Sequence, residues 1–370
     1  MGWGGLWEEA GDSAILFRKG MPLLQTRVKE KRNHTYREGM DMIRFGIIGT
    51  NWITETLIEA ALRTGKVTFT AVYSRTEEKG REFADKFGIP HVYTDLETFG
   101  ESTEFDAVYI ASPNSLHAKY AVQLMNYGKH VLCEKPLASH AREVREMIDA
   151  AKSNNVLLME AVKSTLMPSF RAVQEHLHKI GPVRRYTASY GQYSSRYDAY
   201  KQGTVLNAFK PEFSNGSLMD LGVYCIYPMV VLFGRPQRVQ AEAFMLESGV
   251  DGEGSLLLKY EGMDAVIMHS KIANSYLPAE IQGELGTIVI DRINEPGRVE
   301  IRYKDGRVED LTQPTEHPSM YYEVLEFAAL LEAGATESAV NSHGSSLAAM
   351  QVMEEARKQI GLVFPADSES

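Results

Sequence analysis

The chain has 370 residues, of which 44% are hydrophobic and 24% are charged, and this length and balance predict a folded protein of about two domains. The formal net charge of −10 argues against general binding to nucleic acid, and two cysteines are too few for a disulfide framework, which favours a reducing cytoplasm. No apolar run approaches the roughly 20 residues that cross a bilayer, so we expect no membrane segment.

The first 39 residues differ in pattern from the rest. Their apolar run at 13–17 is too short for the core of a signal peptide, and a small basic run follows at 27–32. Met40 and Met42 directly precede the first patterned strand. We therefore expect residues 1–39 to be a disordered tail or the product of a mis-assigned translation start.

A strand at 43–48, a turn and a helix at 55–62 open the patterned part of the chain. The turn has the place of a dinucleotide fingerprint: Gly49 keeps the first glycine position, Asn51 replaces the second glycine and Thr54 takes the third. Asn51 is tolerable there because asparagine can adopt the left-handed backbone region. An ordinary strand-to-helix turn is the alternative. The residues that we assign to cofactor binding here are Gly49, Thr50, Asn51, Trp52 and Ile53.

The next strand, 67–73, ends in Ser74 and Arg75. An NAD-binding domain usually carries an acidic residue at this distance from the glycine turn, to hold the ribose hydroxyl. An arginine can instead pair with a 2′-phosphate, which a carboxylate would repel. The cofactor expected is therefore NADP, with NAD possible if Arg75 is only a surface residue.

Two further buried strands are predicted at 105–110 and 131–133, and polar residues follow each of them. Ligands gather at the carboxyl ends of parallel strands, so Lys135, after the second of these strands, should point into the cleft. The alternatives are a loop lysine and, for the histidine after the first strand, a partner at the start of a helix. The residues that we assign to cofactor binding here are Ser112, Pro113, Asn114, His117 and Glu134.

The strand–helix alternation without hairpins predicts a Rossmann-type, doubly wound parallel sheet over residues 40–160. From residue 183 the strands alternate polar and apolar residues and are joined by short turns such as Asp251-Gly252, Glu261-Gly262 and Asp305-Gly306. This pattern predicts a substrate-binding and oligomerisation domain over 161–370, an open, mainly antiparallel sheet with helices on one face. We expect its open face to form a homodimer or homotetramer.

The passage at 215–227 stands out within the second domain. Asp220, Tyr224 and Tyr227 lie at i, i+4 and i+7, so they share one face of a helix. An acid and a phenol one turn apart can meet the same small molecule. The alternative is a capped helix whose tyrosines fill the interface between the domains.

Together these motifs resemble the glucose-fructose oxidoreductase and inositol dehydrogenase family (Gfo/Idh/MocA) over residues 42–362. The resemblance is carried in order by the Gly49 turn, the Ser112-Pro113-Asn114 segment, Glu134-Lys135-Pro136, Glu160-Ala161, and the segment from Gly216 to Tyr224. It implies a nicotinamide-dependent oxidoreductase that transfers hydride to or from a sugar, polyol or cyclic diol.

Within the family, the lysine that matches Lys135 lies near the nicotinamide and the substrate hydroxyl. Tyr224, where other members have histidine, is similar to the branch of glucose-fructose oxidoreductase, NADP-linked xylose dehydrogenases and trans-dihydrodiol dehydrogenases. Three departures stand out: the altered glycine fingerprint, Tyr227 where many histidine-type members have aspartate, and, after Glu160-Ala161, a segment without the usual aromatic residue or arginine, in which Lys163 is the candidate substrate contact.

The mechanism that we expect divides the work between two residues. Tyr224 exchanges the hydroxyl proton, because an adjacent ammonium favours its phenolate, while Lys135 orients the oxygen and stabilises its charge. Asp220 holds another substrate hydroxyl, and no metal is expected. The alternatives are a regulatory protein that binds nucleotide and sugar without turnover, and an NAD-dependent glycosidase of the same fold.

Overall fold

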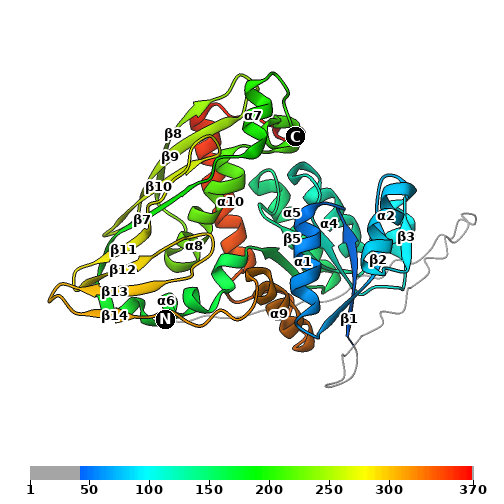
Figure 1. Cartoon of the computed structure of the whole chain (residues 1–370), viewed down its shortest axis with the longest axis horizontal. Coiled ribbons are helices and arrows are strands. Elements are labelled where there is room, and N and C mark those ends of the chain that lie inside the picture. The colour runs from blue at the N-terminus through cyan, green and yellow to red at the C-terminus, as the bar shows by residue number, and fades with distance from the viewer. Residues whose placement is uncertain (1–41, 369–370) are drawn as a thin grey trace, which may run out of the picture. The chain divides into compact units, whose positions relative to one another are not determined.

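The computed structural model describes residues 42–368, so the predictions for residues 1–39 lie outside it. The described residues belong to one compact unit that contains two β-sheets (Figure 1). The predicted fold class, a parallel doubly wound sheet followed by a mainly antiparallel one, is confirmed.

The first sheet has six strands in the order β3-β2-β1-β4-β5-β6, and all of its pairs are parallel. Its central strands are near-continuous apolar runs because helices cover both faces. The strands are β1 (Ile43–Ile48), β2 (Val67–Tyr73), β3 (His91–Tyr93), β4 (Ala107–Ile110), β5 (His130–Glu134) and β6 (Leu158–Ala161). The helices are α1 (Trp52–Leu62), α2 (Glu77–Phe87), α3 (Leu96–Glu101), α4 (His117–Asn126) and α5 (Ala141–Asn154).

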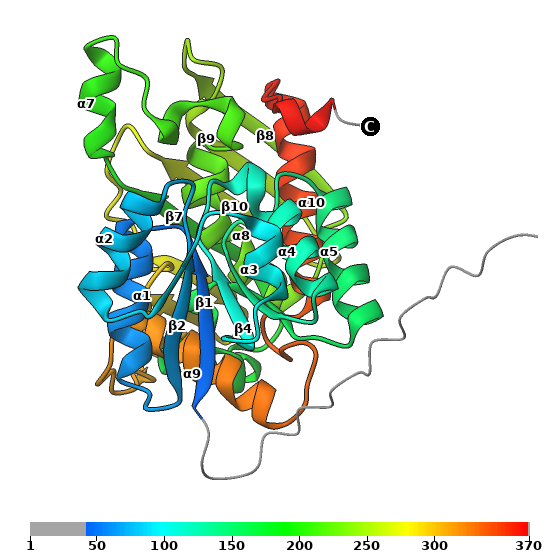
Figure 2. The same cartoon turned by 90° about the vertical axis from the view of Figure 1, so that its right-hand side faces the viewer.

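The two faces of this sheet have separate cores. Helices α1 and α2 pack on one face, whereas α4 and α5 pack on the other together with part of the second half (Figure 2). The carboxyl ends of β1, β2, β4 and β5 all lie at one edge, because the strands are parallel. This edge carries the loops in which sequence analysis placed the cofactor.

The second sheet has eight strands in the order β14-β13-β12-β11-β7-β10-β9-β8. Among the described strands of this sheet, β7 and β10 pair in parallel and the other pairs are antiparallel. The strands are β7 (Val183–Gly191), β8 (Arg238–Met245), β9 (Asp251–Lys259), β10 (Asp264–Ser270), β11 (Ala279–Gly283), β12 (Gly286–Ile290), β13 (Val299–Tyr303) and β14 (Val308–Asp310).

Helices cover one face of the second sheet and leave the other open (Figure 1). The alternating burial along β8 and β10 reflects this one-sided cover. The remaining α-helices are α6 (Pro168–His176), α7 (Ser195–Lys201), α8 (Val223–Phe233), α9 (Ser319–Glu332) and α10 (His343–Ile360). Short turns of 3-10 helix lie at Asn114–Leu116, Lys163–Leu166, Leu177–Ile180, Asn207–Phe209, Pro211–Phe213 and Pro365–Asp367, and a π-helical turn lies at Leu218–Gly222.

Helix α9 returns to the first sheet although it follows the second in sequence. Its buried residues Val324, Phe327 and Ala328 share one core with Phe45 of β1 and Leu57 of α1. The predicted boundary at residue 160 falls within β6, the last strand of the first sheet, and the chain after it contributes to both cores.

One predicted turn is wrong. Asp251 and Gly252 begin strand β9, and the chain reverses just before them, at residues 247–250. Gly249 supplies the positive φ of +89° that the reversal needs. The Asp251 side chain is fully buried and accepts the N–H of Leu218 at 2.6 Å, so it anchors the strand to the core instead of turning the chain.

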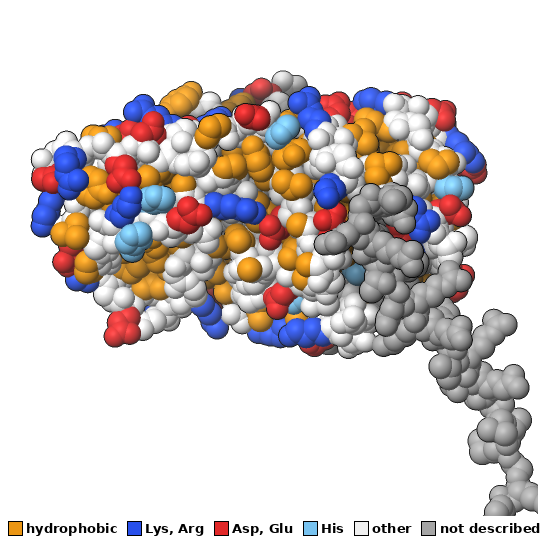
Figure 3. All heavy atoms as spheres, turned by 90° about the horizontal axis from the view of Figure 1, so that it is seen from below, with side chains coloured by type: hydrophobic (Ala, Val, Ile, Leu, Met, Phe, Trp, Pro, Cys, Tyr) orange, Lys and Arg blue, Asp and Glu red, His pale blue; other side chains and the backbone are white. Residues whose placement is uncertain are grey.

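By length and composition alone, the segment Pro211–Phe233 is apolar enough to cross a membrane, with a mean hydropathy of 1.6. No such segment was expected from the sequence. Glycine, polar residues and Asp220 interrupt the apolar run of this segment, so it contains no continuous stretch of about 20 apolar residues. Within the fold, 72% of its apolar window is buried, and it ends in the core helix α8. On the face of the molecule shown in Figure 3, acidic, basic and apolar side chains are interspersed.

Candidate functional site

The loop after β1 approaches the loop after β4 closely. Gly49 has a φ of +109°, and a Cβ at this position would overlap the carbonyl group of Ala111. Only glycine combines this backbone conformation with this contact. The first glycine of the fingerprint is thus required by the meeting of two strand ends.

Asn51 plays a different role from the one predicted. Its φ is −123°, an extended conformation, so the left-handed backbone expected of it is wrong. It caps helix α1: Oδ1 accepts the N–H groups of Ile53 at 3.0 Å and Thr54 at 3.3 Å, while Nδ2 donates to Ala111 O at 2.8 Å. The cap uses two N–H groups at the start of the helix, and cofactor binding by Gly49, Thr50 and the exposed Trp52 stays a prediction.

Thr54 has the third glycine position for a local reason. Its hydroxyl donates to Gly49 O at 2.7 Å, and the residue is fully buried. The hydrogen bond closes the turn across five residues, so this departure from the fingerprint stabilises the loop.

The end of β2 presents one buried and one exposed polar residue. Ser74 is 8% exposed, and its N–H donates to Tyr93 O at 3.0 Å. Arg75 is exposed beside Tyr120; burial raises the pKa of that phenol, and the charge of Arg75 opposes the rise. An exposed guanidinium at this strand end fits a 2′-phosphate, whereas it gives a ribose hydroxyl no particular partner.

His117 supports two loops from behind. Its ring nitrogens lie 3.0 Å from Pro136 O and 2.9 Å from Ser112 O, and the residue has no exposed surface. Burial lowers its pKa, although both carbonyl groups favour the protonated ring. His117 therefore fixes the loops at Ser112 and Pro136 in place, and its predicted part in cofactor binding would be exerted through them.

Ser214 joins the two halves of the site. Asn114, from the turn before α4, donates to Ser214 O at 2.8 Å, and the Ser214 hydroxyl lies 2.7 Å from that of Ser139, which follows the Lys135 loop. Asn114 and Ser139 belong to the first half of the chain, while Ser214 leads into the π-helical turn at Asp220. The loops of the first sheet are thus tied directly to the segment that presents the acid.

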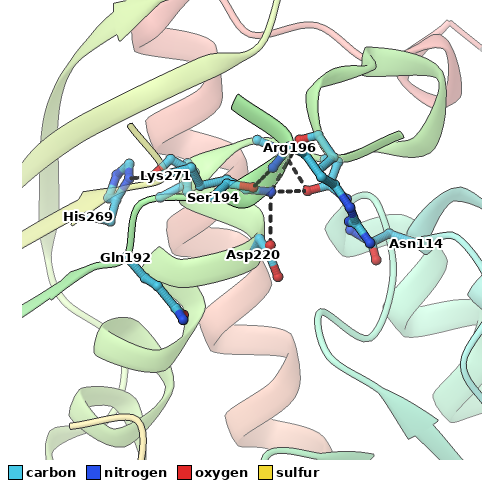
Figure 4. Close-up of polar contacts among 12 residues, drawn as sticks. Asn114, Gln192, Ser194, Arg196, Asp220, His269 and Lys271 are labelled. Carbon is cyan, nitrogen blue, oxygen red and sulfur yellow. Dashed lines mark hydrogen bonds and ion pairs between the residues drawn. The ribbon is translucent and has the colours of Figure 1, made fainter. Parts of the chain in front are cut away.

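Lys135 and Asp220 form the centre of the site. Lys135 Nζ donates to Asp220 Oδ1 at 2.8 Å and to Asp220 O at 3.0 Å. Asp220 Oδ2 pairs with a second lysine, Lys271, at 2.9 Å (Figure 4). Burial alone would raise the pKa of Asp220, but the two ammonium groups outweigh it and hold that pKa far below its usual range. Asp220 is therefore a carboxylate at any pH near neutrality.

Tyr224 lies beside this pair, one turn further along the helix. The ammonium of Lys135 is 4.8 Å from the centre of the Tyr224 ring, so the expected meeting of an amine from the first half with a phenol from the second is observed. Tyr190 packs edge-on against Tyr224 at 5.7 Å between ring centres. Burial raises the pKa of Tyr224, and the opposing effect of Lys135 does not cancel the rise.

Glu134 lies beneath Lys135. It is 7% exposed, accepts the hydroxyl of Tyr109 at 2.6 Å and accepts the backbone N–H of Lys135 at 3.2 Å. Burial raises its pKa, against the effect of the Lys135 charge. These contacts fix the backbone on which Lys135 is mounted, and direct cofactor contact by Glu134 stays a prediction.

Tyr227, which the spacing put on the same helix face as Asp220, and Lys163, predicted to contact the substrate, have different positions. Tyr227 is fully buried with its hydroxyl 3.0 Å from Ser346 Oγ, so it fills the interior, as the structural alternative expected. Lys163 is partly exposed, and its Nζ lies 3.9 Å from Oε1 of Glu295. Glu295 belongs to the loop between β12 and β13. Its role as a substrate contact stays a prediction.

The sequence patterns did not identify Lys271, which pairs with Asp220. Figure 4 shows Lys271 and Asp220 together, with Gln192 pointing away from the pair and Asn114 on the side of the first sheet. A lysine at the end of an alternating strand was the available signal for Lys271, but spacing along the chain does not connect it to Asp220. Within residues 42–368, no group of three or more His, Cys, Asp or Glu side chains is arranged to hold a metal ion.

Family models match most of the described chain. The model described as "Oxidoreductase family, NAD-binding Rossmann fold" matches residues 43–162, and that of the "GFO/IDH/MocA C-terminal domain" matches residues 170–289. The chain belongs to the Gfo/Idh/MocA oxidoreductase family. The resemblance inferred from the motifs is therefore confirmed, and the nucleotide-binding half of the family covers the loops described above.

The alignments with two relatives extend over almost the whole length of each relative. The scyllo-inositol 2-dehydrogenase (NADP(+)) IolU of Bacillus subtilis is 60% identical over 326 residues, which is 88% of this chain and 99% of that protein. The trans-1,2-dihydrobenzene-1,2-diol dehydrogenase of Mus musculus is 30% identical, with the same two coverages of 88% and 99%.

Solved structures show the same fold. The 3-ketoreductase KijD10 of Actinomadura kijaniata, in complex with NADP and TDP-benzene, has a TM-score of 0.75 at 24% identity and covers 86% of this chain and 98% of that one. A levoglucosan dehydrogenase in complex with NADH and levoglucosan also has a TM-score of 0.75, at 20% identity.

Proposed function

We propose that this protein transfers hydride between NADP(H) and a CH–OH group of a polyol, sugar or cyclic diol, with NAD(H) as a weaker alternative. The observation that carries the proposal is the convergence of Lys135, Asp220 and Tyr224 from the two halves of the chain. The substrates named for the Bacillus subtilis and mouse relatives, an inositol and a cyclic diol, support a ring that bears neighbouring hydroxyl groups.

The residues present fit a bound dinucleotide. The Gly49–Trp52 loop and the Ser112–Asn114 turn meet at the carboxyl edge of the parallel sheet, and Arg75 lies exposed where a 2′-phosphate would need a cation. When bound, NADP supplies the carbon that accepts or donates the hydride. The protein supplies the position of the substrate and the handling of its proton.

Lys135 has one N–H left for the substrate. An ammonium group has three N–H bonds, and Asp220 accepts two of those of Lys135, through O and Oδ1. The third can donate to the reacting oxygen. Lys135, Lys271 and Asp220 together carry a charge of about +1 by simple summation, so an alkoxide that forms beside them is stabilised by groups already in place.

Tyr224 is the proton-exchanging group in this proposal. Because burial keeps its pKa above the usual value, the phenol holds its proton at neutral pH and can donate it to a carbonyl oxygen during reduction. Oxidation runs the step in reverse: the substrate hydroxyl gives its proton to the phenolate as hydride leaves carbon. This direction is therefore favoured as the pH rises.

The test is a substrate panel with both cofactors. Purified protein is incubated with NADP⁺ or NAD⁺ and scyllo-inositol, myo-inositol, aldoses, cyclic diols or glycosides; reduced nicotinamide is followed by its absorbance, and sugar released from the glycosides is measured. We expect at least one ring polyol to reduce the nicotinamide, and to reduce NADP⁺ faster than NAD⁺. Tight cofactor binding without turnover would instead indicate a regulatory protein, and sugar release from glycosides without net reduction would indicate a glycosidase.

We also propose a homodimer or homotetramer in the cytoplasm. The open face of the second sheet carries the exposed side chains of Phe244 and Leu257, and Phe244 and Leu277 help to line a hollow of about 490 Å³. Such apolar surface favours association. Light scattering should give a multiple of the chain mass, reduced by Phe244→Asp, and a monomer would contradict the proposal. Two free, buried cysteines, Cys133 and Cys225, support a reducing compartment, which cell fractionation tests.

A further inference from the structure

Lys271 is a buried charge at the edge of the candidate site. It follows the last residue of β10, and its backbone N–H donates to Gly252 O at 2.8 Å, so the strand pairing fixes its position. The residue is 3% exposed. A buried ammonium is costly unless it is paired and hydrogen-bonded, so the partners of Lys271 explain why it is tolerated.

Each N–H of the Lys271 ammonium has an acceptor. Nζ lies 3.2 Å from Ala208 O, 3.2 Å from Asn215 Oδ1 and 2.9 Å from Asp220 Oδ2, and it also lies 5.3 Å from the centre of the Phe209 ring. Three acceptors match the three donors of the group. The ammonium is therefore held in one position.

Asp220 divides its two oxygens between two cations. Oδ1 binds Lys135 and Oδ2 binds Lys271, while 37% of the Asp220 side chain remains exposed, against 3% for that of Lys271. A carboxylate with a free Oδ2 could rotate and accept a second N–H from Lys135. That rotation would use the N–H that the substrate oxygen needs.

We propose that Lys271 is a positioning residue, which holds Asp220 Oδ2 so that Lys135 keeps one N–H for the reacting oxygen of the substrate. This inference rests on the proposed function. It also assigns Lys271 an electrostatic effect, because its loss reduces the summed charge of the three groups by one and weakens the stabilisation of an alkoxide beside Lys135.

The variants Lys271→Met and Lys271→Arg test the inference, with Lys129→Met as a matched control. Lys129 is also buried, at 8% exposure, but it donates to the backbone carbonyls of Ser102 and Phe105, away from Asp220. Lys271→Met should lower kcat about 10- to 100-fold, the range for a misplaced catalytic group, with the affinity for NADP⁺ nearly unchanged. Lys271→Arg should restore part of the loss.

The pH dependence of kcat/KM distinguishes a positioning role of Lys271 from a contribution to the stability of the fold alone. With one cation fewer, Asp220 takes up a proton more readily, so kcat/KM of Lys271→Met should fall at acidic pH values at which the wild type still keeps its carboxylate. Lys129→Met should lower the melting temperature without producing that fall. A wild-type kcat and pH profile in Lys271→Met, with only a lower melting temperature, would overturn the inference.

A titration that needs no turnover completes the test. The carboxyl signal of Asp220, assigned with Asp220→Asn in ¹³C-aspartate-labelled protein, should stay at the carboxylate position down to acidic pH in the wild type and should begin to titrate at a higher pH in Lys271→Met. An unchanged titration contradicts the inference whether or not a substrate has been found, whereas a wild type inactive on the whole panel contradicts only the proposed function. If Lys271→Met fails to fold, Lys271→Gln, which can keep the bond to Ala208 O, is judged by the same criteria.

Discussion

The ammonium of Lys135, at the end of β5, lies 2.8 Å from Oδ1 of Asp220 in the π-helical turn before α8. This ion pair joins the nucleotide-binding half of the chain to the half that carries the second sheet. Since neither group moves without affecting the other, the first sheet and the substrate-binding segment are coupled at the point where the chemistry is proposed to occur.

Lys135→Met should abolish most turnover. It removes the donor to the reacting oxygen, so kcat should fall by about 10²- to 10⁴-fold, the contribution typical of a positioned proton-handling group. The affinity for NADP⁺, measured by fluorescence titration, should change little, because Asp220 keeps Lys271 as a partner. Lys66→Met, at a lysine on the surface, is the control. Full activity in Lys135→Met would remove Lys135 from the mechanism.

Tyr224→Phe should flatten the pH dependence of the reaction. Burial raises the pKa of Tyr224 above its ordinary value of 10.0, so the phenolate that oxidation needs becomes more populated as the pH rises. Oxidation by the wild type should therefore accelerate through the alkaline range, and reduction should slow there. In Tyr224→Phe both rates should be low and nearly independent of pH. Tyr190→Phe, which removes the hydroxyl of the adjacent ring, should keep the wild-type profile.

Arg75→Ala should weaken the preference for NADP. A charge-assisted hydrogen bond to a phosphate contributes about 1.5–3 kcal/mol, so the Kd of NADP⁺ should rise roughly 10- to 100-fold while that of NAD⁺ stays within about twofold. Arg81→Ala, in the following helix α2, is the matched control because Arg81 is also exposed. Equal effects of Arg75→Ala on both cofactors would show that Arg75 does not bind the 2′-phosphate.

Asp251→Asn should stabilise the protein at neutral and alkaline pH. Burial raises the pKa of Asp251 from 3.8 to about 6, so the folded state favours the protonated carboxyl group. The stability that this preference contributes is fully present below pH 3.8 and is lost as the pH rises through about 6, where folding has to bury a carboxylate. Asparagine can still accept the N–H of Leu218 without a buried charge. By urea unfolding, the variant should gain up to about 3 kcal/mol at pH 8 and little at pH 4. A loss of stability at pH 8 would contradict this expectation.

Local patterns predicted the elements that depend on neighbouring residues. Short apolar runs alternate with segments whose apolar residues have helical spacing, and this alternation predicted the parallel sheet. Polar residues at the strand ends predicted the loops at Gly49, Ser112 and Lys135. The i, i+4 spacing placed Asp220 and Tyr224 together, and both lie beside Lys135. These features are decided by side-chain period and strand direction, which a sequence displays directly.

Contacts between distant segments were beyond such patterns. Spacing alone could not tell that Asn51 caps α1 and bonds to Ala111 or that Tyr227 faces Ser346. The parallel pairing of β7 with β10, which fixes the strand that Lys271 follows, joins segments about eighty residues apart.

The sequence by itself determined the order of the elements, the family and the identity of the amine and the phenol, because each is encoded in residues close together along the chain. Only the tertiary structure decided that Asp220 is shared between two lysines and that His117 is buried behind the cofactor loops. The reason is physical: the ionisation and orientation of a side chain depend on the charges and burial around it in space, and those neighbours come from strands far apart in the chain.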